Sequence, residues 1–310
     1  MSLESSYKKF AIENCLSVTE GKGGLPFIEI DNGYASALIS IYGAQVLSYK
    51  SKLNDNNENI DKDLLFVSEK AYYQPGKAIK GGVPICWPWF GDDPEDKGRA
   101  AHGFVRNRQW EVSGTKILED DSIQVRLNIK DNDETREIWP CSFQLILQVT
   151  VGSSLSIELL THNTGNEPFF ISQALHTYFK VGDISQVQVL GLENHDYLDK
   201  ADKGLKKQQA GPVVIENEVD RIYMKVKNKL MIADASFGRN IHISSSGSQT
   251  AVVWNPWVKI AAAMGDLNNE DYRHMLCVET VNAVDDIVQI QPGSDYRLKV
   301  NYSIENHQAS

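Results

Sequence analysis

The sequence predicts an all-β fold, a large antiparallel β-sandwich with few short helices. Apolar and polar residues alternate with period two in its clearest segments, predicted strands occur along the whole chain, and strong helical periodicity is scarce. Period-two alternation is typical of strands that bury one face. Because predicted helices do not alternate with these strands, a parallel βαβ architecture finds little support.

The alternation is clearest in residues 296–304, where every second residue is apolar. Residues 123–129, 145–151 and 155–159 repeat the pattern. Successive side chains of a strand point to opposite faces of the sheet, so these segments predict strands with one covered face.

Other segments are short and mostly apolar, and they predict further strands. They are residues 27–30, 37–42, 230–233, 251–254 and 276–281. A turn or short helix is expected between Lys259 and Met275. The polar stretches 54–63 and 199–211 predict exposed loops. Neither is long enough for an interdomain linker, so we expect residues 1–310 to form a single domain with a polar C-terminal tail at 305–310.

The composition is that of an ordinary globular protein, with 310 residues, 42% of them hydrophobic and 23% charged. The net charge of -10 and the pI near 5.2 argue against a nucleic-acid or anionic-membrane partner, because such surfaces require a broad basic field. A small anionic ligand needs only a local group of cations, and that possibility stays open.

The first ten residues contain no apolar stretch behind a basic one, so they do not resemble a secretory signal. No apolar run approaches the ~20 residues that cross a bilayer. We therefore expect a cytoplasmic protein. The four cysteines form no C-x-x-C pair, which argues against a zinc ribbon or dithiol site and favours buried free thiols.

An irregular segment at residues 78–91 combines a Gly-Gly pair, two prolines and clustered aromatic residues. Aromatic faces cover the C–H patches of sugars in many carbohydrate sites. The alternative is that Trp87, Trp89 and Phe90 are core aromatics, and this segment alone favours that alternative.

Cations gather in the next segment, residues 101–108, which holds a histidine and two arginines and leads into a strand beginning near Trp110. The planar guanidinium group suits phosphate oxygens, and Lys80 could add a point charge. A solvated basic patch is the competing interpretation, which we favour for Arg99 and Arg108.

Two titratable residues stand in otherwise apolar stretches, His176 and Glu279. Burying such a group is costly unless it has partners or a function. A lone histidine of this kind is more often a hydrogen-bonded core residue. Glu279 could face solvent, but Cys277 and Val281 would then lie outside with it, which is an unattractive arrangement.

Six motifs occur in order along the chain: Ile79-Lys-Gly-Gly-Val-Pro with Pro88-Trp-Phe-Gly91, His102-Gly-Phe-Val-Arg106, Ala174-Leu-His-Thr-Tyr-Phe179, Asp220-Arg-Ile-Tyr223, Val253-Trp-Asn-Pro-Trp257 and Cys277-Val-Glu279. Together they resemble the hexose-6-phosphate mutarotase family, also called glucose-6-phosphate 1-epimerase, which is similar to aldose 1-epimerase (galactose mutarotase). The resemblance implies one large galactose mutarotase-like supersandwich.

The same resemblance implies an isomerase that interconverts the α and β anomers of a hexose 6-phosphate, with glucose 6-phosphate as the expected substrate. His176 corresponds to the general acid and Glu279 to the general base. We expect the histidine to start as imidazolium and the glutamate as carboxylate, and no metal or organic cofactor to be needed.

Four further residues match substrate-binding positions or line the expected pocket. Lys80, Arg106 and Asp220 correspond to substrate ligands, and His102 is expected to line the pocket without acting in catalysis. The family commonly has arginine at the position of Lys80, so this sequence departs from the pattern there and a point-charge contact replaces a bidentate one.

Two other functions stay open at this point. The chain could be an aldose 1-epimerase acting on unphosphorylated sugars such as galactose or glucose, or a non-catalytic carbohydrate-binding module. For the phosphate-specific enzyme, the expected partner is a small hexose phosphate, with no nucleic acid and no membrane, and the expected assembly is a monomer.

Overall fold

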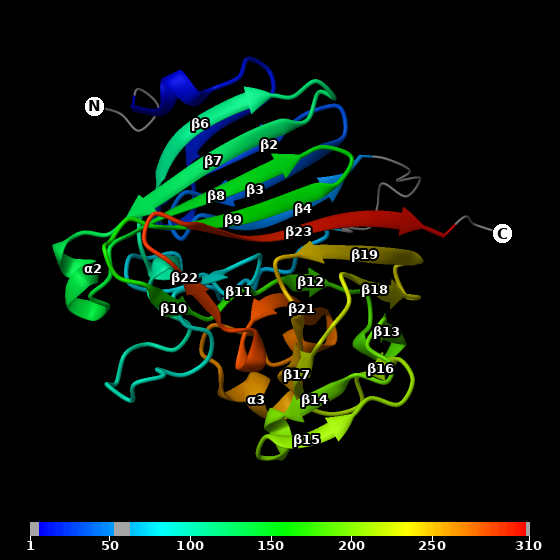
Figure 1. Cartoon of the computed structure of the whole chain (residues 1–310). Coiled ribbons are helices and arrows are strands. Elements are labelled where there is room, and N and C mark those ends of the chain that lie inside the picture. The colour runs from blue at the N-terminus through cyan, green and yellow to red at the C-terminus, as the bar shows by residue number, and fades with distance from the viewer. Residues whose placement is uncertain (1–5, 53–62, 308–310) are drawn as a thin grey trace.

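Antiparallel strands form most of the regular structure in the computed structural model, which describes residues 6–52 and 63–307 (Figure 1). The described residues contain sheets of nine, eight, four and two strands. The nine-stranded sheet has the order β16 (Val213–Val214), β13 (Val187–Leu190), β18 (Lys229–Asp234), β19 (Arg239–Ser246), β23 (Asp295–Asn306), β9 (Leu155–Asn163), β8 (Phe143–Val151), β7 (Ile123–Lys130) and β6 (Glu111–Ile117). The predicted all-β class is confirmed.

The eight-stranded sheet contains the central strands of the molecule. Its order is β15 (Leu205–Gln208), β14 (Asp196–Asp199), β17 (Val219–Met224), β20 (Thr250–Asn255), β21 (Met275–Asn282), β11 (Gln173–Leu175) and β5 (Ile85–Cys86), with β12 (Tyr178–Lys180) also paired to β21. Two strands, β11 and β12, therefore pair with the same long strand and leave a short break between them.

The smaller sheets and the helices complete the fold. The four-stranded sheet contains β1 (Leu16–Glu20), β2 (Pro26–Asp31), β3 (Ala35–Ser40) and β4 (Gln45–Ser51), and the two-stranded sheet contains β10 (Phe169–Ile171) and β22 (Val288–Ile290). The α-helices of the described residues are α2 (Asp133–Ile138) and α3 (Trp257–Ala263). Single 3₁₀ turns are η1 (Lys8–Phe10), η2 (Lys22–Gly24), η3 (Val105–Asn107), η4 (Ile184–Gln186), η5 (Lys200–Asp202), η6 (Asp271–Arg273) and η7 (Val284–Asp286).

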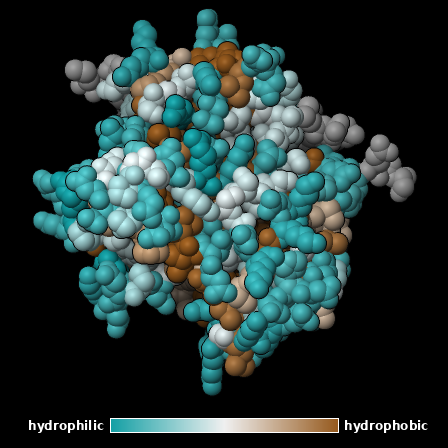
Figure 2. All heavy atoms as spheres, viewed as in Figure 1, coloured by the Kyte–Doolittle hydropathy of each residue, from teal (hydrophilic) through white to brown (hydrophobic). Residues whose placement is uncertain are grey.

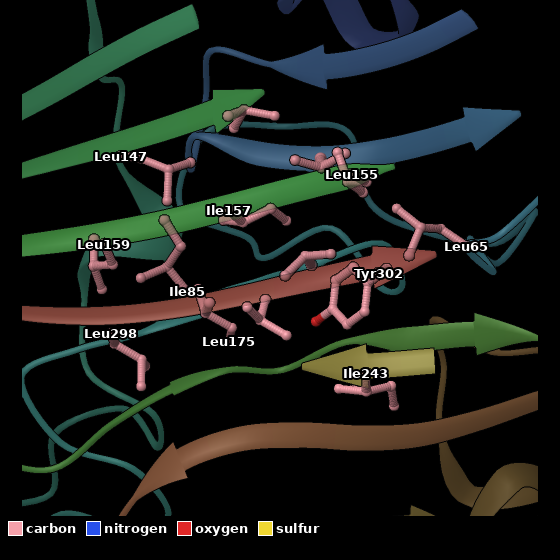
Figure 3. Close-up of a cluster of buried hydrophobic side chains, with 14 of the residues drawn as sticks. Leu65, Ile85, Leu147, Leu155, Ile157, Leu159, Leu175, Ile243, Leu298 and Tyr302 are labelled. Carbon is pink, nitrogen blue, oxygen red and sulfur yellow. The ribbon is translucent and has the colours of Figure 1, made fainter. Parts of the chain in front are cut away.

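The main core lies between the nine-stranded sheet and the elements on either side of it. Figure 3 shows Leu147 and Leu159 of that sheet near Ile85 and Leu175 of the eight-stranded sheet, and all four are buried. On the other side, β2, β3 and β4 lie behind β7, β8 and β9 (Figure 1), and their buried residues join the same cluster. Full burial of one such aliphatic side chain contributes roughly 1.5–3 kcal/mol, so this cluster is the main source of stability.

Strand β21 differs from the strands of the nine-stranded sheet, because all eight of its residues are buried. Leu276 and Val278 belong to the main core. Cys277 and Val281 point to the opposite face, where other apolar clusters cover them. The sequence left two interpretations of Glu279 open, a solvent-exposed residue and a functional one. The structure shows Glu279 only 3% exposed, on the same face as Cys277 and Val281.

The structure departs from the sequence predictions about loops and helices at three places. The expected loop at 199–211 contains β15, which forms a hairpin with β14. Helix α2 was not predicted; a capping box between Asn132 and Thr135 starts it, and its six residues are too few for a clear helical period. The short helix expected between Lys259 and Met275 is confirmed in part, since α3 begins two residues earlier and η6 follows.

Two polar segments are only partly described. Most of the predicted loop at 54–63 lies outside the described residues. Asp63, at its end, is buried rather than exposed, and its carboxylate accepts hydrogen bonds from the backbone N–H groups of Tyr49 and Leu65, both at 2.9 Å. The predicted tail at 305–310 begins too early, because β23 continues to Asn306; residues 308–310 lie outside the described part.

The outer surface is mainly polar. Figure 2 shows one face on which hydrophilic residues predominate and hydrophobic residues form small groups. Among the described residues, the helices are all too short or too polar to cross a membrane.

Candidate active site

A cavity of about 710 Å³ lies over one face of the eight-stranded sheet. Two rows of cross-strand neighbours form its floor, because directly paired residues of antiparallel strands point to the same face. One row runs across β17, β20, β21 and β12 through Asp220, Trp254, Cys277 and Tyr178. Of these four residues, all but Cys277 line the cavity. The second row joins Ile222, Val252 and Glu279. A cavity of this volume is typical of small-molecule sites.

Every site residue predicted from the sequence lines this cavity. They are Lys80, His102, Arg106, His176, Asp220 and Glu279. These residues are spread over 200 positions of the chain, and the strand pairing and the two loops before residue 107 bring them together.

His176 reaches Glu279 because of the break between β11 and β12. Both strands pair with β21, Leu175 opposite Thr280 and Tyr178 opposite Cys277, so the residues between them lie beside Glu279. The backbone N–H of His176 donates to the carbonyl of Pro84 at 3.0 Å, which anchors the break.

The two side chains are in direct contact and almost completely buried. His176 Nδ1 lies 3.4 Å from Glu279 Oε1, and the side chains are 10% and 1% exposed. The imidazole ring stacks on Tyr178 with centroids 4.8 Å apart and an angle of 9° between the planes. Trp254 meets the same ring edge-on. Aromatic packing therefore fixes the orientation of the imidazole, while neither Nδ1 nor Glu279 Oε2 has a hydrogen-bond partner in the described structure.

Burial moves both pKa values toward the neutral forms. It lowers the pKa of His176 well below 6.5, and His102, Arg106 and Lys80 add to this shift. It raises the pKa of Glu279 well above 4.5, with a further contribution from Asp220. Burial therefore disfavours the expected imidazolium beside a carboxylate relative to the neutral pair. A neutral imidazole and a carboxylic acid carry the same number of protons, so the two states differ by one proton moved between the two side chains.

The two cations predicted from the sequence, Lys80 and Arg106, differ in whether a carboxylate already lies beside them. Lys80 Nζ lies 3.5 Å from Asp266 Oδ2. Arg106 donates from Nη2 to the carbonyl of Ala101 at 3.0 Å, and its buried Nε has no partner. Within residues 6–52 and 63–307, no carboxylate forms an ion pair with Arg106. Its guanidinium group thus keeps the capacity to bind an anion.

His102 is a neutral hydrogen-bond acceptor in this site. Its Nδ1 accepts from the backbone N–H of Gly91 at 3.2 Å. Burial, with help from Arg106 and Lys80, lowers its pKa to about 3. Its backbone has φ +65°, an uncommon conformation for a residue with a side chain. A histidine in this state can contact a ligand but cannot supply a proton near neutral pH.

Asp220 lies at the other end of the cavity floor. Burial raises the pKa of its carboxyl group to about 6, and Lys200 opposes that shift. Lys200 also lines the cavity but was not predicted. It stands in the stretch 199–211, whose polar composition resembles that of an ordinary surface loop, so the sequence offered no local signal.

The core alternative for the aromatic residues of segment 78–91 is confirmed for two of the three and wrong for Phe90. Trp87 and Trp89 are buried in the main core, whereas Phe90 lines the cavity. Arg99 and Arg108 lie outside the cavity, but they are not a solvated patch. Arg99 stacks on Trp89 at 4.3 Å and pairs with Asp93 and Glu95, and Arg108 pairs with Glu134 at 2.9 Å.

Comparisons with known proteins agree with this geometry. The sequence profile described as aldose 1-epimerase matches residues 26–303. A curated protein of Cenchrus ciliaris, named "Putative glucose-6-phosphate 1-epimerase", is 40% identical over 276 residues, which cover 86% of this chain and 80% of that protein. A protein of the same name from Salmonella typhimurium is 32% identical over 261 residues and 84% of each chain.

Solved structures give the same result for the fold. A structure described as a "putative mutarotase" from Salmonella typhimurium matches with a TM-score of 0.87 at 29% identity over 96% of each chain. A "galactose mutarotase related enzyme" from Lactobacillus acidophilus, 14% identical, matches with a TM-score of 0.71 over 91% of this chain and 98% of that one. The predicted galactose mutarotase-like architecture is confirmed, and the chain belongs to the aldose 1-epimerase family.

Proposed function

We propose that this protein is an isomerase that interconverts the α and β anomers of a hexose 6-phosphate, with glucose 6-phosphate as its substrate. The observation that carries the proposal is the buried contact of 3.4 Å between His176 and Glu279 in a cavity that also contains Arg106. The names of the curated relatives from Cenchrus ciliaris and Salmonella typhimurium support the same substrate.

The acid–base pair suits the chemistry of anomer exchange. Ring opening removes a proton from the C1 hydroxyl and adds one to the ring oxygen, after which the C1–C2 bond rotates and the ring closes on the other face. Both oxygens are bonded to C1, so one compact pair of acid and base can serve both. In our proposal Glu279 accepts the hydroxyl proton and His176 donates to the ring oxygen, and the two roles reverse on closure.

The burial of both side chains favours the protonation state that ring opening produces. After ring opening, Glu279 is a carboxylic acid and His176 a neutral imidazole, which is the state that burial favours. The reactive state before opening has the charged forms, and burial makes that carboxylate a stronger base and that imidazolium a stronger acid. The proton shift that creates the charged state occurs between two groups already in contact.

Phosphate recognition rests mainly on Arg106. Its buried Nε has no hydrogen-bond partner, and no carboxylate of the described residues forms an ion pair with it. Both observations support a charge-assisted contact with a phosphate oxygen. Lys80 contributes a weaker point charge because Asp266 already lies beside it. Asp220 and His102 provide acceptors for sugar hydroxyls in the same cavity.

An unphosphorylated aldose is the second candidate substrate, because the family profile that matches this chain is described as aldose 1-epimerase. Exchange NMR on glucose 6-phosphate, glucose and galactose separates the two candidates. We expect kcat/KM for glucose 6-phosphate to exceed the other two by at least about tenfold, the effect of one charge-assisted contact. Equal values for the three sugars would contradict the phosphate assignment.

We also infer that the chain works as one domain, because one hydrophobic core contains side chains from Leu16 to Tyr302. A monomer in the cytoplasm stays our prediction from the sequence. Gel filtration at working concentration tests the monomer.

A further inference from the structure

A third potential ligand atom lies beside the acid–base pair. Cys277 is fully buried on β21, two residues before Glu279 and on the same face. The nearest ligand atoms of His176, Cys277 and Glu279 all lie within 4.8 Å of one another. The mechanism proposed above uses the imidazole and the carboxyl group but has no role for the thiol.

The two other members of this group have unused polar atoms. His176 Nδ1 and Glu279 Oε2 are buried without a hydrogen-bond partner. Leaving such an atom unsatisfied costs about 1–3 kcal/mol, so most proteins avoid it. Both atoms are available to a ligand that binds between the two side chains.

The spacing of these atoms suits a tetrahedral metal ion. Bonds of about 2.1 Å from zinc to nitrogen and oxygen set the two ligand atoms about 3.4 Å apart, and His176 Nδ1 and Glu279 Oε1 are 3.4 Å apart. A bond of about 2.3 Å to sulfur requires about 3.6 Å between Sγ and either partner. From the 4.8 Å upper limit, Cys277 therefore has to approach by no more than about 1.2 Å.

The charges of the group also suit a divalent ion. A thiolate and a carboxylate together neutralise Zn²⁺, and a neutral imidazole completes the set of three, so no net charge is left in the buried site. Zinc binding displaces the proton of the thiol, because a coordinating thiol is deprotonated by the ion.

We propose that His176, Cys277 and Glu279 form a binding site for Zn²⁺ or a similar borderline-soft ion, with its fourth position open to the cavity. Magnesium and calcium do not fit, since sulfur and imidazole are poor ligands for hard cations. The ion occupies the lone pairs that act as acid and base. Zinc therefore inhibits anomer exchange, a consequence that rests on the proposed function, whereas binding itself does not.

Cobalt(II) is the probe for binding, because a tetrahedral Co²⁺–thiolate site absorbs in the near ultraviolet and visible range. The full-length protein, stripped of metal, should develop these bands with one equivalent of Co²⁺ and lose them when Zn²⁺ is added. The Cys277→Ser variant should lose the near-ultraviolet band. Cys86→Ser is the matched control, since Cys86 is equally buried on β5 but does not belong to the group of three.

The metal affinity gives the quantitative test. Loss of an outer partner of a metal ligand weakens binding about 10–100-fold, so we expect Cys277→Ser, which removes a direct ligand, to weaken Zn²⁺ binding more than 100-fold and Cys86→Ser to leave it unchanged. Circular dichroism checks that both variants fold. If Cys277→Ser does not fold, Glu279→Gln and His176→Asn must each reduce Co²⁺ affinity instead. A band that survives in all three variants, or no band in the wild type, overturns the proposed site.

Inhibition is measured separately, so that the two proposals fail in different ways. Zinc should stop glucose 6-phosphate exchange by the wild-type protein, a chelator should restore it, and Cys277→Ser should need more than 100-fold more zinc. If the protein shows the cobalt bands after Co²⁺ is added but exchanges no sugar in its metal-free form, the mutarotase proposal is overturned and the metal site stands. If the protein exchanges sugar but shows no cobalt bands, the metal site is overturned and the mutarotase proposal stands.

Discussion

Strands β9 and β21 have similar lengths but use their two faces differently. In β9, buried and partly exposed residues alternate strictly, and the buried ones pack into the main core. In β21 every residue is buried. One face contributes Leu276 and Val278 to the same core, while the other carries Cys277 and Glu279 toward the cavity side. The comparison indicates that β9 mainly stabilises the fold, whereas β21 both stabilises it and positions the site.

The glutamates of the two strands show the same difference. On the partly exposed face of β9, Glu158 forms an ion pair with Arg297 at 2.7 Å, and the two side chains are 18% and 60% exposed. On the cavity face of β21, Glu279 has one carboxylate oxygen without a partner. An unpaired carboxylate oxygen in a buried cavity marks a candidate functional group.

The largest expected effect is on the cavity side. His176→Asn keeps a polar group of similar size but removes the titratable nitrogen, so it should lower kcat for glucose 6-phosphate about 10²–10⁴-fold. The unfolding midpoint should change little. Exchange NMR measures the rate after subtraction of the spontaneous reaction. A kcat near the wild-type value would mean that the acid is another residue.

The nine-stranded sheet should respond in the opposite way. Leu159→Ala in β9 leaves a cavity in the main core, because Leu159 is fully buried there (Figure 3). The free energy of unfolding should fall by about 2–5 kcal/mol, measured by urea denaturation, while kcat of the folded protein stays the same. A large loss of kcat without loss of stability would show that the two regions are not separate in function.

A smaller effect is expected for substrate binding. Arg106→Ala removes a cavity cation that forms no ion pair with a carboxylate of residues 6–52 and 63–307. A hydrogen bond to a charged group contributes about 1.5–3 kcal/mol, so KM for glucose 6-phosphate should rise about 10–100-fold. KM for free glucose should hardly change. Steady-state exchange rates for both sugars measure this. Equal increases for the two sugars would remove Arg106 from phosphate recognition.

The smallest expected effect is the change of kcat with pH around 6.5. The pair is active while it holds one titratable proton in total. Because the pKa of His176 is lowered, the acid limb of the profile lies below 6.5, and because the pKa of Glu279 is raised, the alkaline limb lies well above 4.5. The profile of kcat should therefore not follow the titration of an ordinary imidazole at 6.5.

Saturating substrate is needed for that profile. Asp220, whose pKa is about 6, and the phosphate group both titrate nearby and would change KM. An imidazolium with the ordinary pKa of 6.5 would instead cause kcat to fall with each pH unit above that value, and this result would contradict the electrostatic description of the pair.

The sequence was most informative where the signal is local. Strict alternation in residues 145–151 and 155–159 predicted β8 and β9, because one-sided burial appears directly in the order of residues. It could not show that β11 and β12 share β21, which is the pairing that brings His176 to Glu279. That pairing depends on contacts distant in the sequence.

The electrostatic details of the site were also hidden. Arg99 pairs with Asp93 and Glu95 of its own loop, whereas Arg108 pairs with Glu134 of α2, which is 26 residues away in the sequence. The protonation of His176 and Glu279 depends on complete burial, which a strand covered on both faces does not reveal by alternation. Family motifs identified these two residues, and the structure supplied their environment.

The central claim, that the cavity face of β21 carries the catalytic base, has one direct test. Two-dimensional exchange NMR on glucose 6-phosphate compares wild type, Glu279→Gln and the matched variant Glu158→Gln on the exposed face of β9. We expect Glu279→Gln to remove nearly all catalysed exchange while retaining the fold, and Glu158→Gln to exchange at the wild-type rate. Near-normal exchange by a folded Glu279→Gln variant would contradict the account.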